Sequence, residues 1–579
     1  MNDTWPKVLA SNYEKYGSRK AMRYKHYGIW RAVTWENYYL DVKYLALGLI
    51  VLGFEPGDKL LIIGDNAPEW HFAELAAQAL HGVSVGVYPD LSPSEIDAIA
   101  TEVDARFAVC EDQEQVDKLL EIKTSFQKIV YWNYKGLAHY SDPRLIGYRE
   151  VLDLGRGSPH PECFEAGMAK GNPDDVCVLV YTSGTTAAPR AAVHTFRTLR
   201  AGAESLLSLD PWNEHDEVVP ASTPAWIMGQ WAAIGCHLLS RCILNFPEDP
   251  ETRAQDTREM EPTVVLYGAR FWESQAAALQ ARMLDLDAVK RFMFRLFMPH
   301  GHKKPSFVAD LILFEAVRRA LGLSRARICY STGAILSPYA MRFYHALGIP
   351  VKSLYATTEG GVLAGPRNDD IPIDTVGPFL AGCEARIIDG EITYRSPGAF
   401  IGYYKDPPAK DGWFPTNDAG LIVDGALRFI DRKDSLIGTF APQAIEAALR
   451  FSPFIADAWV FAGGALIVIN FPVVARWAGK RKIAFSTFAE LARAPEVYDL
   501  IRADIDRVNA DLPASCRIAR YVNFHREFDA GAGEVTRSLN LRRKALQERY
   551  RGIVDAIGAG KTSVEAPDGT ILTIRGATP

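Results

Sequence analysis

Short apolar, β-branched runs alternate with longer helix-compatible stretches along the first 400 residues of the chain. Residues 59–64 (KLLIIG), 83–87 (VSVGV) and 107–110 (FAVC) have the length and composition of buried strands. Residues 69–81 and 92–103 lie between these runs and are predicted helices. Such alternation predicts βαβ units, and therefore parallel sheets covered by helices.

The pattern changes near Arg432. Residues 431–434 form a charged break (DRKD) directly after a predicted strand at 427–430. The elements predicted beyond the break are a helix at 442–450, a β-hairpin at 456–470 and charged helices at 497–510 and 537–557. This order is typical of a smaller α+β domain.

We therefore predict an α/β protein with two domains. Residues 1–432 form a large N-terminal domain of mixed, mostly parallel sheets flanked by helices, and residues 433–579 form a smaller α+β C-terminal domain. The tail after about Gly558 is rich in Gly, Thr and Pro and is predicted to be loosely ordered.

Composition narrows the class of protein. The chain is 48% hydrophobic and 23% charged, with a net charge of −6, which gives no support for a nucleic-acid partner. Its eight cysteines are scattered without a Cys-x-x-Cys pair, which argues against a zinc site or a disulfide framework. Residues 1–17 lack an apolar signal core, and residues 459–479 are interrupted by Gly463, Asn470 and Pro472. We expect a cytoplasmic protein without a transmembrane segment.

The run YTSGTTAAPRAAVHT, residues 181–195, is the first candidate for chemistry. It follows a buried-strand pattern at 176–180 and precedes a helix-compatible stretch at 196–209. Backbone N–H groups and short hydroxyls of such a loop can surround phosphate oxygens, and a helix N-terminus adds positive potential. The alternative interpretation is an ordinary polar turn.

Three further motifs follow in order. They are STGA at 331–334, YATTE at 355–359 and GWFPTND at 412–418, and Arg432 comes 14 residues after the last. An aromatic ring can bind a flat base, and carboxylate oxygen is a preferred ligand of Mg²⁺. A second carboxylate can accept hydrogen bonds from two hydroxyls. Each motif alone also fits a strand-end turn or a solvated carboxylate, so the order of the motifs carries the interpretation.

In this order the motifs resemble the adenylate-forming superfamily, which includes acyl-CoA synthetases, peptide-synthetase adenylation domains and beetle luciferases. The resemblance spans residues 30–554 and is strongest to bacterial long-chain or aryl acyl-CoA synthetases. It implies ATP, Mg²⁺ and CoA as cofactors, with Glu359 holding Mg²⁺ and Thr185, Arg190 and Glu359 acting in catalysis. It also implies a mobile C-terminal domain that rotates about Asp434. The implied nucleotide contacts are Thr182, Ser183, Gly184, Thr185, Thr186, Gly333, Ala334, Tyr355, Thr358, Asp418 and Arg432.

Several positions depart from the family pattern around the phosphates. Ala187, Ala191 and Ala356 replace glycines, which narrows the allowed backbone and adds a methyl group near the nucleotide. Arg190 replaces a lysine and offers a planar fork in place of a point charge. Asn417 replaces another glycine, and asparagine tolerates left-handed backbone geometry better than most residues.

The family's C-terminal catalytic lysine is missing. Its position is Asn540 in the long-chain alignment and Glu534 in the short-chain alignment. Removing one fixed transition-state donor costs roughly 2.7–4 kcal/mol, or about 10²–10³ in rate. Residues 542–544 (RRK) offer other cations, although helix direction argues against direct replacement. The segment 435–446 also begins several residues short of the loop that lines the CoA tunnel in relatives.

The acid pocket is predicted from the run PAWIMGQ at 224–230. Its predicted lining is Trp226, Ile227, Gln230 and Tyr330, and the neighbouring Met228 and Trp231 would make it apolar. Core packing explains these side chains equally well. An apolar pocket suits a fatty, alicyclic or aromatic acid. Residues 292–298 (FMFRLFM) allow peripheral membrane contact, although an internal amphipathic helix is favoured.

Three functions stay open at this stage. The first is an ATP-dependent acid–thiol ligase that forms an acyl-adenylate and then an acyl-CoA, slowly if the missing lysine limits it. The second is acyl-adenylate formation with an acceptor other than CoA. The third is a nucleotide- or acyl-binding homologue with impaired catalysis. The sequence leaves the identity of the acid and the oligomeric state open.

Overall fold

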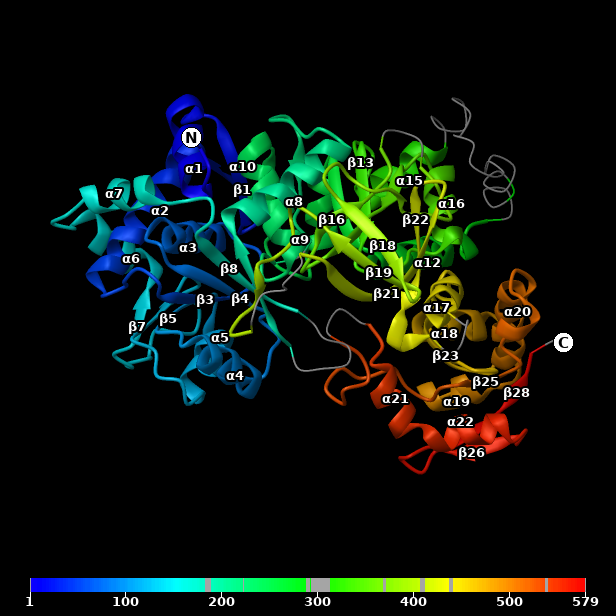
Figure 1. Ribbon diagram of the computed structural model, residues 1–579. Coiled ribbons are helices and arrows are strands. Elements are labelled where there is room, and N and C mark those ends of the chain that lie inside the picture. Colours follow the sequence, from blue (N-terminus) through cyan, green and yellow to red (C-terminus); the bar gives the residue numbers. More distant parts are fainter. Residues whose placement is uncertain are drawn as a thin grey trace.

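The computed structural model describes residues 2–577 except residues 183–188, 222, 288–291, 293–312, 368–370, 407–411, 437–440 and 537–539. Figure 1 shows a large body that contains the N-terminus and a smaller body, yellow to red, at its lower right edge. The predicted α/β class, with large mostly parallel sheets and a smaller α+β part, is confirmed. The domain boundary at residue 432 stays a prediction.

The first large sheet has eight strands in the order β20–β9–β8–β4–β3–β5–β6–β7. They are β3 (Lys59–Ile63), β4 (Val83–Val87), β5 (Phe107–Cys110), β6 (Lys128–Tyr131), β7 (Leu145–Gly147), β8 (Val176–Tyr181), β9 (Ala191–Thr195) and β20 (Gly402–Tyr403). The strands from β8 to β7 run parallel, whereas β9 is antiparallel to β8 and to β20. The strands predicted at 59–64, 83–87 and 107–110 are confirmed at its centre.

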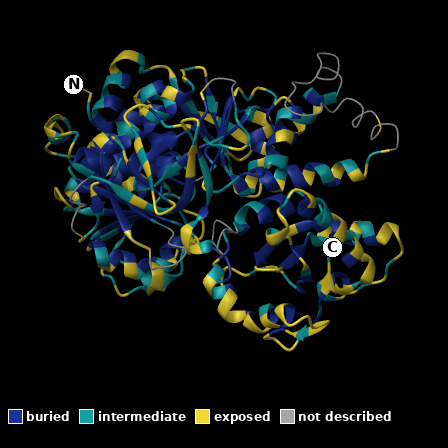
Figure 2. Ribbon diagram, turned by 45° about the vertical axis from the view of Figure 1, so that its right-hand side comes forward, coloured by how far each residue is buried: buried dark blue, intermediate teal, exposed yellow. Residues whose placement is uncertain are grey.

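The second large sheet has seven strands in the order β14–β13–β12–β10–β11–β1–β2, parallel except for β1 and β2. They are β1 (Lys20–His26), β2 (Ile29–Thr34), β10 (Glu217–Val218), β11 (Ile243–Phe246), β12 (Val264–Gly268), β13 (Ile328–Thr332) and β14 (Val351–Ser353). Side chains of both sheets, among them Ile62 and Leu244, join one buried core with Trp35, Trp70 and Trp231. Figure 2 shows this dark blue interior under exposed outer helices.

Helices cover and connect these two sheets. They are α1 (Trp5–Tyr16), α2 (Trp35–Val51), α3 (Pro68–Ala79), α4 (Pro93–Val103), α5 (Gln113–Glu121), α6 (Tyr148–Arg156), α7 (Glu162–Lys170), α8 (Phe196–Leu209), α9 (Ile227–Gly229), a π-helix (Gln230–Cys236), α10 (His237–Ser240), α11 (Arg253–Met260), α12 (Ala269–Leu284), α15 (Glu315–Leu321) and α16 (Pro338–Ala346). The helices predicted at 69–81 and 92–103 are confirmed. Helix α4 begins where the Ser92 side chain accepts from the Glu95 N–H and Glu95 accepts from the Ser92 N–H.

An antiparallel sheet joins the large body to the smaller one. Its order is β17–β22–β21–β19–β18, and a two-stranded ribbon, β15–β16, accompanies it. The strands are β15 (Tyr355–Thr357), β16 (Gly361–Ala364), β17 (Gly377–Pro378), β18 (Glu384–Ile388), β19 (Glu391–Arg395), β21 (Phe414–Val423) and β22 (Ala426–Arg432). A 3₁₀ turn, Lys433–Ser435, then leads to the C-terminal elements.

The C-terminal elements surround the sheet β23–β24–β25–β28. They are α17 (Pro442–Arg450), β23 (Ile455–Phe461), β24 (Gly464–Ile469), α18 (Phe471–Lys480), α19 (Phe488–Arg493), α20 (Pro495–Ala510), a 3₁₀ turn (Ala514–Cys516), β25 (Arg520–Asn523), α21 (Arg543–Arg549), α22 (Arg551–Gly558), β26 (Ser563–Glu565), β27 (Ile571–Thr573) and β28 (Arg575–Gly576). The predicted hairpin at 456–470 and the helices at 442–450 and 497–510 are confirmed.

Two expectations about the C-terminus are wrong. The single helix expected over 537–557 is divided into α21 and α22, and helix begins only at Arg543. The tail is not loosely ordered, because its strands β26 and β27 pair with each other and β28 pairs with β25. Leu572 and Ile574 are 0% and 3% exposed in a core shared with Trp459, so a few apolar side chains fix a tail of polar composition.

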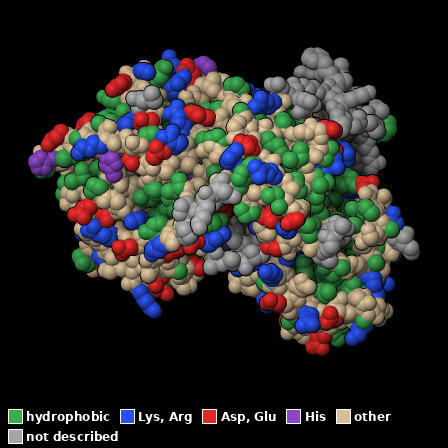
Figure 3. Space-filling view, in the orientation of Figure 1, with side chains coloured by type: hydrophobic (Ala, Val, Ile, Leu, Met, Phe, Trp, Pro, Cys, Tyr) green, Lys and Arg blue, Asp and Glu red, His purple; other side chains and the backbone are tan. Residues whose placement is uncertain are grey.

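No helix among the described residues is long and apolar enough to cross a membrane. Acidic and basic side chains are interspersed on the face shown in Figure 3. Phe292 is 64% exposed, and the rest of the run that suggested membrane contact, residues 293–298, lies outside the described residues.

Candidate functional site

A cavity of about 660 Å³ lies where the antiparallel sheet and β13 to β15 meet the C-terminal elements. It brings together side chains that are far apart in the sequence, from the end of β8 to the start of α21. The sequence-predicted residues that line it are Thr182, Arg190, Gly333, Ala334, Tyr355, Thr358, Glu359, Asp418, Arg432, Asp434 and Asn540. Ser183, Gly184, Thr185 and Thr186 lie outside the described residues.

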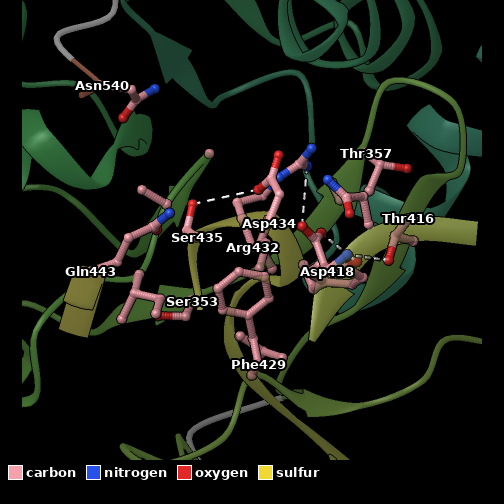
Figure 4. Close-up of a pocket in the computed structure, with 18 of the residues that line it drawn as sticks. Ser353, Thr357, Thr416, Asp418, Phe429, Arg432, Asp434, Ser435, Gln443 and Asn540 are labelled. Atoms are coloured by element: carbon pink, nitrogen blue, oxygen red, sulfur yellow. Dashed lines mark hydrogen bonds and ion pairs between the residues drawn. The ribbon is translucent and has the colours of Figure 1, made fainter. Parts of the chain in front are cut away.

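The hairpin of β21 and β22 places Asp418 directly opposite Arg432. Arg432 Nη1 donates to Asp418 Oδ1 at 3.1 Å, as Figure 4 shows. Burial raises the pKa of Asp418, which is 4% exposed, to about 6, although the Arg432 guanidinium opposes the shift. The buried Nε of Arg432 has no hydrogen-bond partner among the described residues. Asn417 has a φ of 58°, the left-handed geometry that favours asparagine at a glycine position.

Tyr355, the first residue of strand β15, lies against this pair, and the turn after β13 lines the same cavity. Its hydroxyl donates to Asp418 Oδ2 at 2.7 Å, and its ring lies 5.9 Å from the ring of Phe429. The turn contains Gly333 at a φ of 81°, a conformation that side chains other than glycine seldom adopt. Ala356 lies in strand β15 without a positive φ, so alanine causes no backbone strain at that position. Tyr355, Phe429 and Gly333 form one wall of the cavity, and the Tyr355 side chain is buried in it.

The phosphate-loop region differs from the prediction in one respect. Residues 191–195, predicted as part of the loop, form strand β9, antiparallel to β8, whereas helix α8 begins at Phe196 as predicted. The helix N-terminus therefore does not follow the loop directly. The ends of the loop are joined where the Thr182 N–H donates to the Arg190 carbonyl at 3.0 Å. Ala191 starts β9 and is buried, again without a positive φ.

A polar chain connects Arg190 to the predicted metal ligand. The Arg190 guanidinium lies 3.6 Å from the centre of the Tyr403 ring, and the Tyr403 hydroxyl donates to Glu359 Oε1 at 2.7 Å. Burial raises the pKa of Tyr403, so its hydroxyl stays protonated. A carboxylate, which can bind Mg²⁺, and a guanidinium, which can bind phosphate oxygens, thus lie on one side of the cavity.

The two residues aligned with the missing lysine lie in different places at the C-terminal edge of the cavity. Asn540 lines the cavity and lies across it from Asp418 in Figure 4. Glu534 is fully buried, where its carboxylate accepts from Arg526 at 2.6 Å and bonds to Tyr550. It is not among the lining residues. The long-chain register, with asparagine at the lysine position, therefore agrees with the geometry.

Two other cations lie at this edge. Arg543 donates to Glu446 at 2.6 and 3.0 Å, so its charge is paired. Lys544 is exposed and also lines the cavity. Arg542, the first residue of the RRK run, is exposed and is not among the lining residues.

The predicted acid-pocket residues are mostly core. Ile227 and Gln230 are 2% and 1% exposed, and Gln230 Nε2 donates to the Pro224 carbonyl at 2.7 Å. Tyr330 is fully buried with its hydroxyl 2.6 Å from Asp210, so its side chain points away from the cavity. Trp226 alone of the four is half-buried, and a Cβ on Gly333 would lie 3.6 Å from its ring. None of the four is among the lining residues.

Sequence reasoning missed several lining residues. Tyr403 lines the cavity but was not predicted as a site residue. Arg270 follows the carboxyl end of the parallel strand β12, where ligands of α/β sheets commonly bind. Gln443 is the second residue of α17, and its N–H donates to Asp431 at 3.0 Å. The strand-end rule could have found Arg270.

A family model described as AMP-binding enzyme matches residues 9–404 of this chain. The chain belongs to the AMP-binding enzyme family. This confirms the resemblance to adenylate-forming enzymes. A long-chain-fatty-acid–CoA ligase of Mus musculus is 26% identical over 94% of this chain and 84% of the relative. A long-chain-fatty-acid–CoA ligase of Mycobacterium bovis is 26% identical over 92% of this chain and 93% of the relative.

Solved structures of other proteins share the fold. The A domain of a carboxylic acid reductase from Segniliparus rugosus, in complex with AMP and a co-purified carboxylic acid, gives a TM-score of 0.74. That match has 17% identity and covers 96% of this chain and 94% of the other. An anthranilate CoA ligase in complex with anthranoyl-AMP gives a TM-score of 0.70 at 17% identity, covering 94% and 96%.

Proposed function

We propose that this protein activates an apolar carboxylic acid with ATP and transfers the acyl group to CoA. In the first step a carboxylate oxygen attacks the α-phosphorus and pyrophosphate leaves, giving an acyl-adenylate. In the second step the CoA thiol attacks the acyl carbon and AMP leaves. One observation carries the proposal: a single cavity gathers Glu359, Asp418 and Arg432 together with Asn540 of the C-terminal elements.

The chemistry of the lining residues fits a magnesium nucleotide. Asp418 has two carboxylate oxygens for the ribose hydroxyls, and the unpartnered Nε of Arg432 is a buried donor beside it. Glu359 would hold Mg²⁺, which neutralises phosphate charge when bound. The exposed guanidinium of Arg190 would contact phosphate oxygens. The Tyr355 wall and the Gly333 turn would hold the adenine.

The substrate class rests on the relatives and on the apolar part of the lining. Both relatives described above bear the name of long-chain fatty-acid ligases, which supports a fatty acid and CoA as the acceptor. Leu336, Leu354 and Ile373 line the cavity, and Trp226 lies beside the Gly333 turn. All eight cysteines are free thiols, which supports a cytoplasmic location.

A binding protein with impaired catalysis is the second candidate. It is favoured by Asn540, which places a neutral amide in the cavity at the lysine position. Residues 437–440, within the segment 435–446 that bears on the CoA acceptor, lie outside the described residues, so an acceptor other than CoA stays a third proposal. We expect nucleotide binding to persist in each case. Failure to bind ATP in the millimolar range would overturn all three.

Pyrophosphate release from Mg-ATP tests these proposals. The natural chain is assayed with fatty, alicyclic and aromatic acids, with and without CoA. Release that continues past one turnover only with CoA supports the ligase. A single turnover that CoA does not extend supports another acceptor. No release from the natural chain, despite ATP binding, supports the binding protein.

A further inference from the structure

Tyr403 occupies an unusual place between two parts of the candidate site. It lies on the two-residue strand β20, which pairs with β9 so that Tyr403 is opposite Ala192. Strand β9 is the continuation of the phosphate-loop region, and Glu359 follows the ribbon strand β15. The backbone thus brings a phenol from a third segment to the meeting point of the other two.

Tyr403 contacts one side chain with its hydroxyl and another with its ring. The Tyr403 hydroxyl donates to Glu359 Oε1 at 2.7 Å, and the ring lies under the Arg190 guanidinium at 3.6 Å. Arg190 is otherwise exposed, with its nearest acidic partner, Asp406, 4.0 Å away. Arginine side chains lose conformational freedom when they bind, and an aromatic platform reduces that loss by holding the guanidinium in place.

A hydrogen bond to one carboxylate oxygen also orients the other. Because Oε1 accepts from the phenol, Oε2 of Glu359 is the oxygen that would bind a cation. Outer partners of this kind fix ligand geometry in metal sites, and their removal typically costs about 10–100-fold in metal affinity or activity.

We propose that Tyr403 is a positioning residue that orients Glu359 for the magnesium ion and Arg190 for the phosphates of the bound nucleotide. The inference rests on the proposed function, because it assigns those ligands to Glu359 and Arg190. It does not require catalysis, because the arrangement acts on nucleotide binding.

The test is calorimetric binding of ATP to the full chain without any acid, once with Mg²⁺ and once with EDTA. Tyr403→Phe removes the hydroxyl and keeps the ring, so we expect Mg-ATP to bind about 10–100-fold more weakly while metal-free ATP binds as before. Tyr403→Leu also removes the platform, and we expect both forms of ATP to bind more weakly. Tyr404→Phe is the matched control, because Tyr404 packs against the hydrophobic core cluster that contains Leu179 and Val193.

Three outcomes separate the possible failures. Unchanged Mg-ATP affinity in a folded Tyr403→Phe protein would overturn the role of Tyr403. An equal loss with and without Mg²⁺ would also overturn it, since the hydroxyl would then act on structure alone. No ATP binding by the natural chain would instead reject the proposed function.

In a Glu359→Gln background, Tyr403→Phe should cause less than a twofold further loss of Mg-ATP affinity, because the carboxylate partner is already gone. A full additional loss would contradict the coupling between Tyr403 and Glu359.

Discussion

The two ends of the cavity differ in how completely their polar groups are arranged. At the nucleotide end, the carboxylate of Asp418 accepts from both Tyr355 and Arg432 and is almost fully buried. At the C-terminal end, Asn540 is neutral and Arg543 is paired with Glu446. Groups suited to holding a nucleotide are in place at the first end, whereas at the second end Asn540 occupies the position that the resemblance assigns to the family's lysine. Binding and acceleration are separate properties, because only interactions that strengthen in the transition state raise the rate.

The two ends are also held by different means. A hairpin register fixes the first, whereas ion pairs between the two bodies position the second. Arg450 of α17 donates to Glu273 of α12 at 2.7 Å, and Arg270 donates to Asp457 of β23 at 2.8 Å. Figure 1 shows α12 beside α17 at this junction. A substitution in one of these ion pairs should therefore disturb the C-terminal end of the cavity while the hairpin of β21 and β22 stays intact.

The largest effect is expected from Arg450→Met. Its partner Glu273 has a side chain only 2% exposed, and an uncompensated buried charge destabilises a protein by about 3–5 kcal/mol. We expect the urea midpoint of the C-terminal elements to fall, while adenosine binding at the hairpin persists below that midpoint. Lys480→Met, which breaks an exposed pair with Asp285, is the control and should cost at most about 1 kcal/mol. An equal effect of the two variants would contradict this account.

Asn540→Lys tests the missing cation directly. If its absence limits adenylation, the variant should release pyrophosphate about 10²–10³-fold faster than the natural chain. Asn540→Gln, which adds length without charge, should change little. Lys544→Ala is the complementary variant, because Lys544 is the exposed cation that lines the same edge. A large loss in Lys544→Ala together with no gain in Asn540→Lys would show that Lys544 already supplies the charge.

The nucleotide end was also the part that the sequence predicted best. The spacing of Asp418 and Arg432 belongs to a local hairpin, so a linear motif contains most of its geometry. Helix α8 also follows from a local sequence pattern, and its bounds agree with the predicted stretch at 196–209.

What the sequence did not predict depends on tertiary pairing. Residues 191–195 are predicted as the end of the phosphate-loop run, yet they pair with β8. Tyr330 is predicted to line the acid pocket. Successive side chains on a strand face opposite sides, and the side of Tyr330 is the core. Packing against distant strands settles both positions.

Asp418→Asn tests the nucleotide end of the cavity and is expected to have an effect of intermediate size. The amide keeps the shape of the side chain but loses the charge-assisted bond to Arg432. Hydrogen bonds to charged groups contribute about 1.5–3 kcal/mol, so ATP should bind roughly 10–100-fold more weakly. Asp424→Asn, an exposed change in the turn of the same hairpin, should leave affinity unchanged. Equal ATP affinity in the Asp418→Asn protein, measured calorimetrically, would remove Asp418 from the nucleotide site.

The smallest expected effect is the pH dependence of adenosine binding. Because burial raises the pKa of Asp418 to about 6, its carboxylate becomes protonated as the pH falls through that value and then accepts hydrogen bonds poorly. Adenosine affinity should therefore fall about tenfold between pH 7 and pH 5. Adenosine is the probe because it has no phosphate to titrate. Asp431, whose pKa burial also raises to about 6, lies nearby. The Asp418→Asn protein separates the two: a flat profile assigns the dependence to Asp418, whereas an unchanged slope assigns it to Asp431 and removes ionised Asp418 from adenosine recognition.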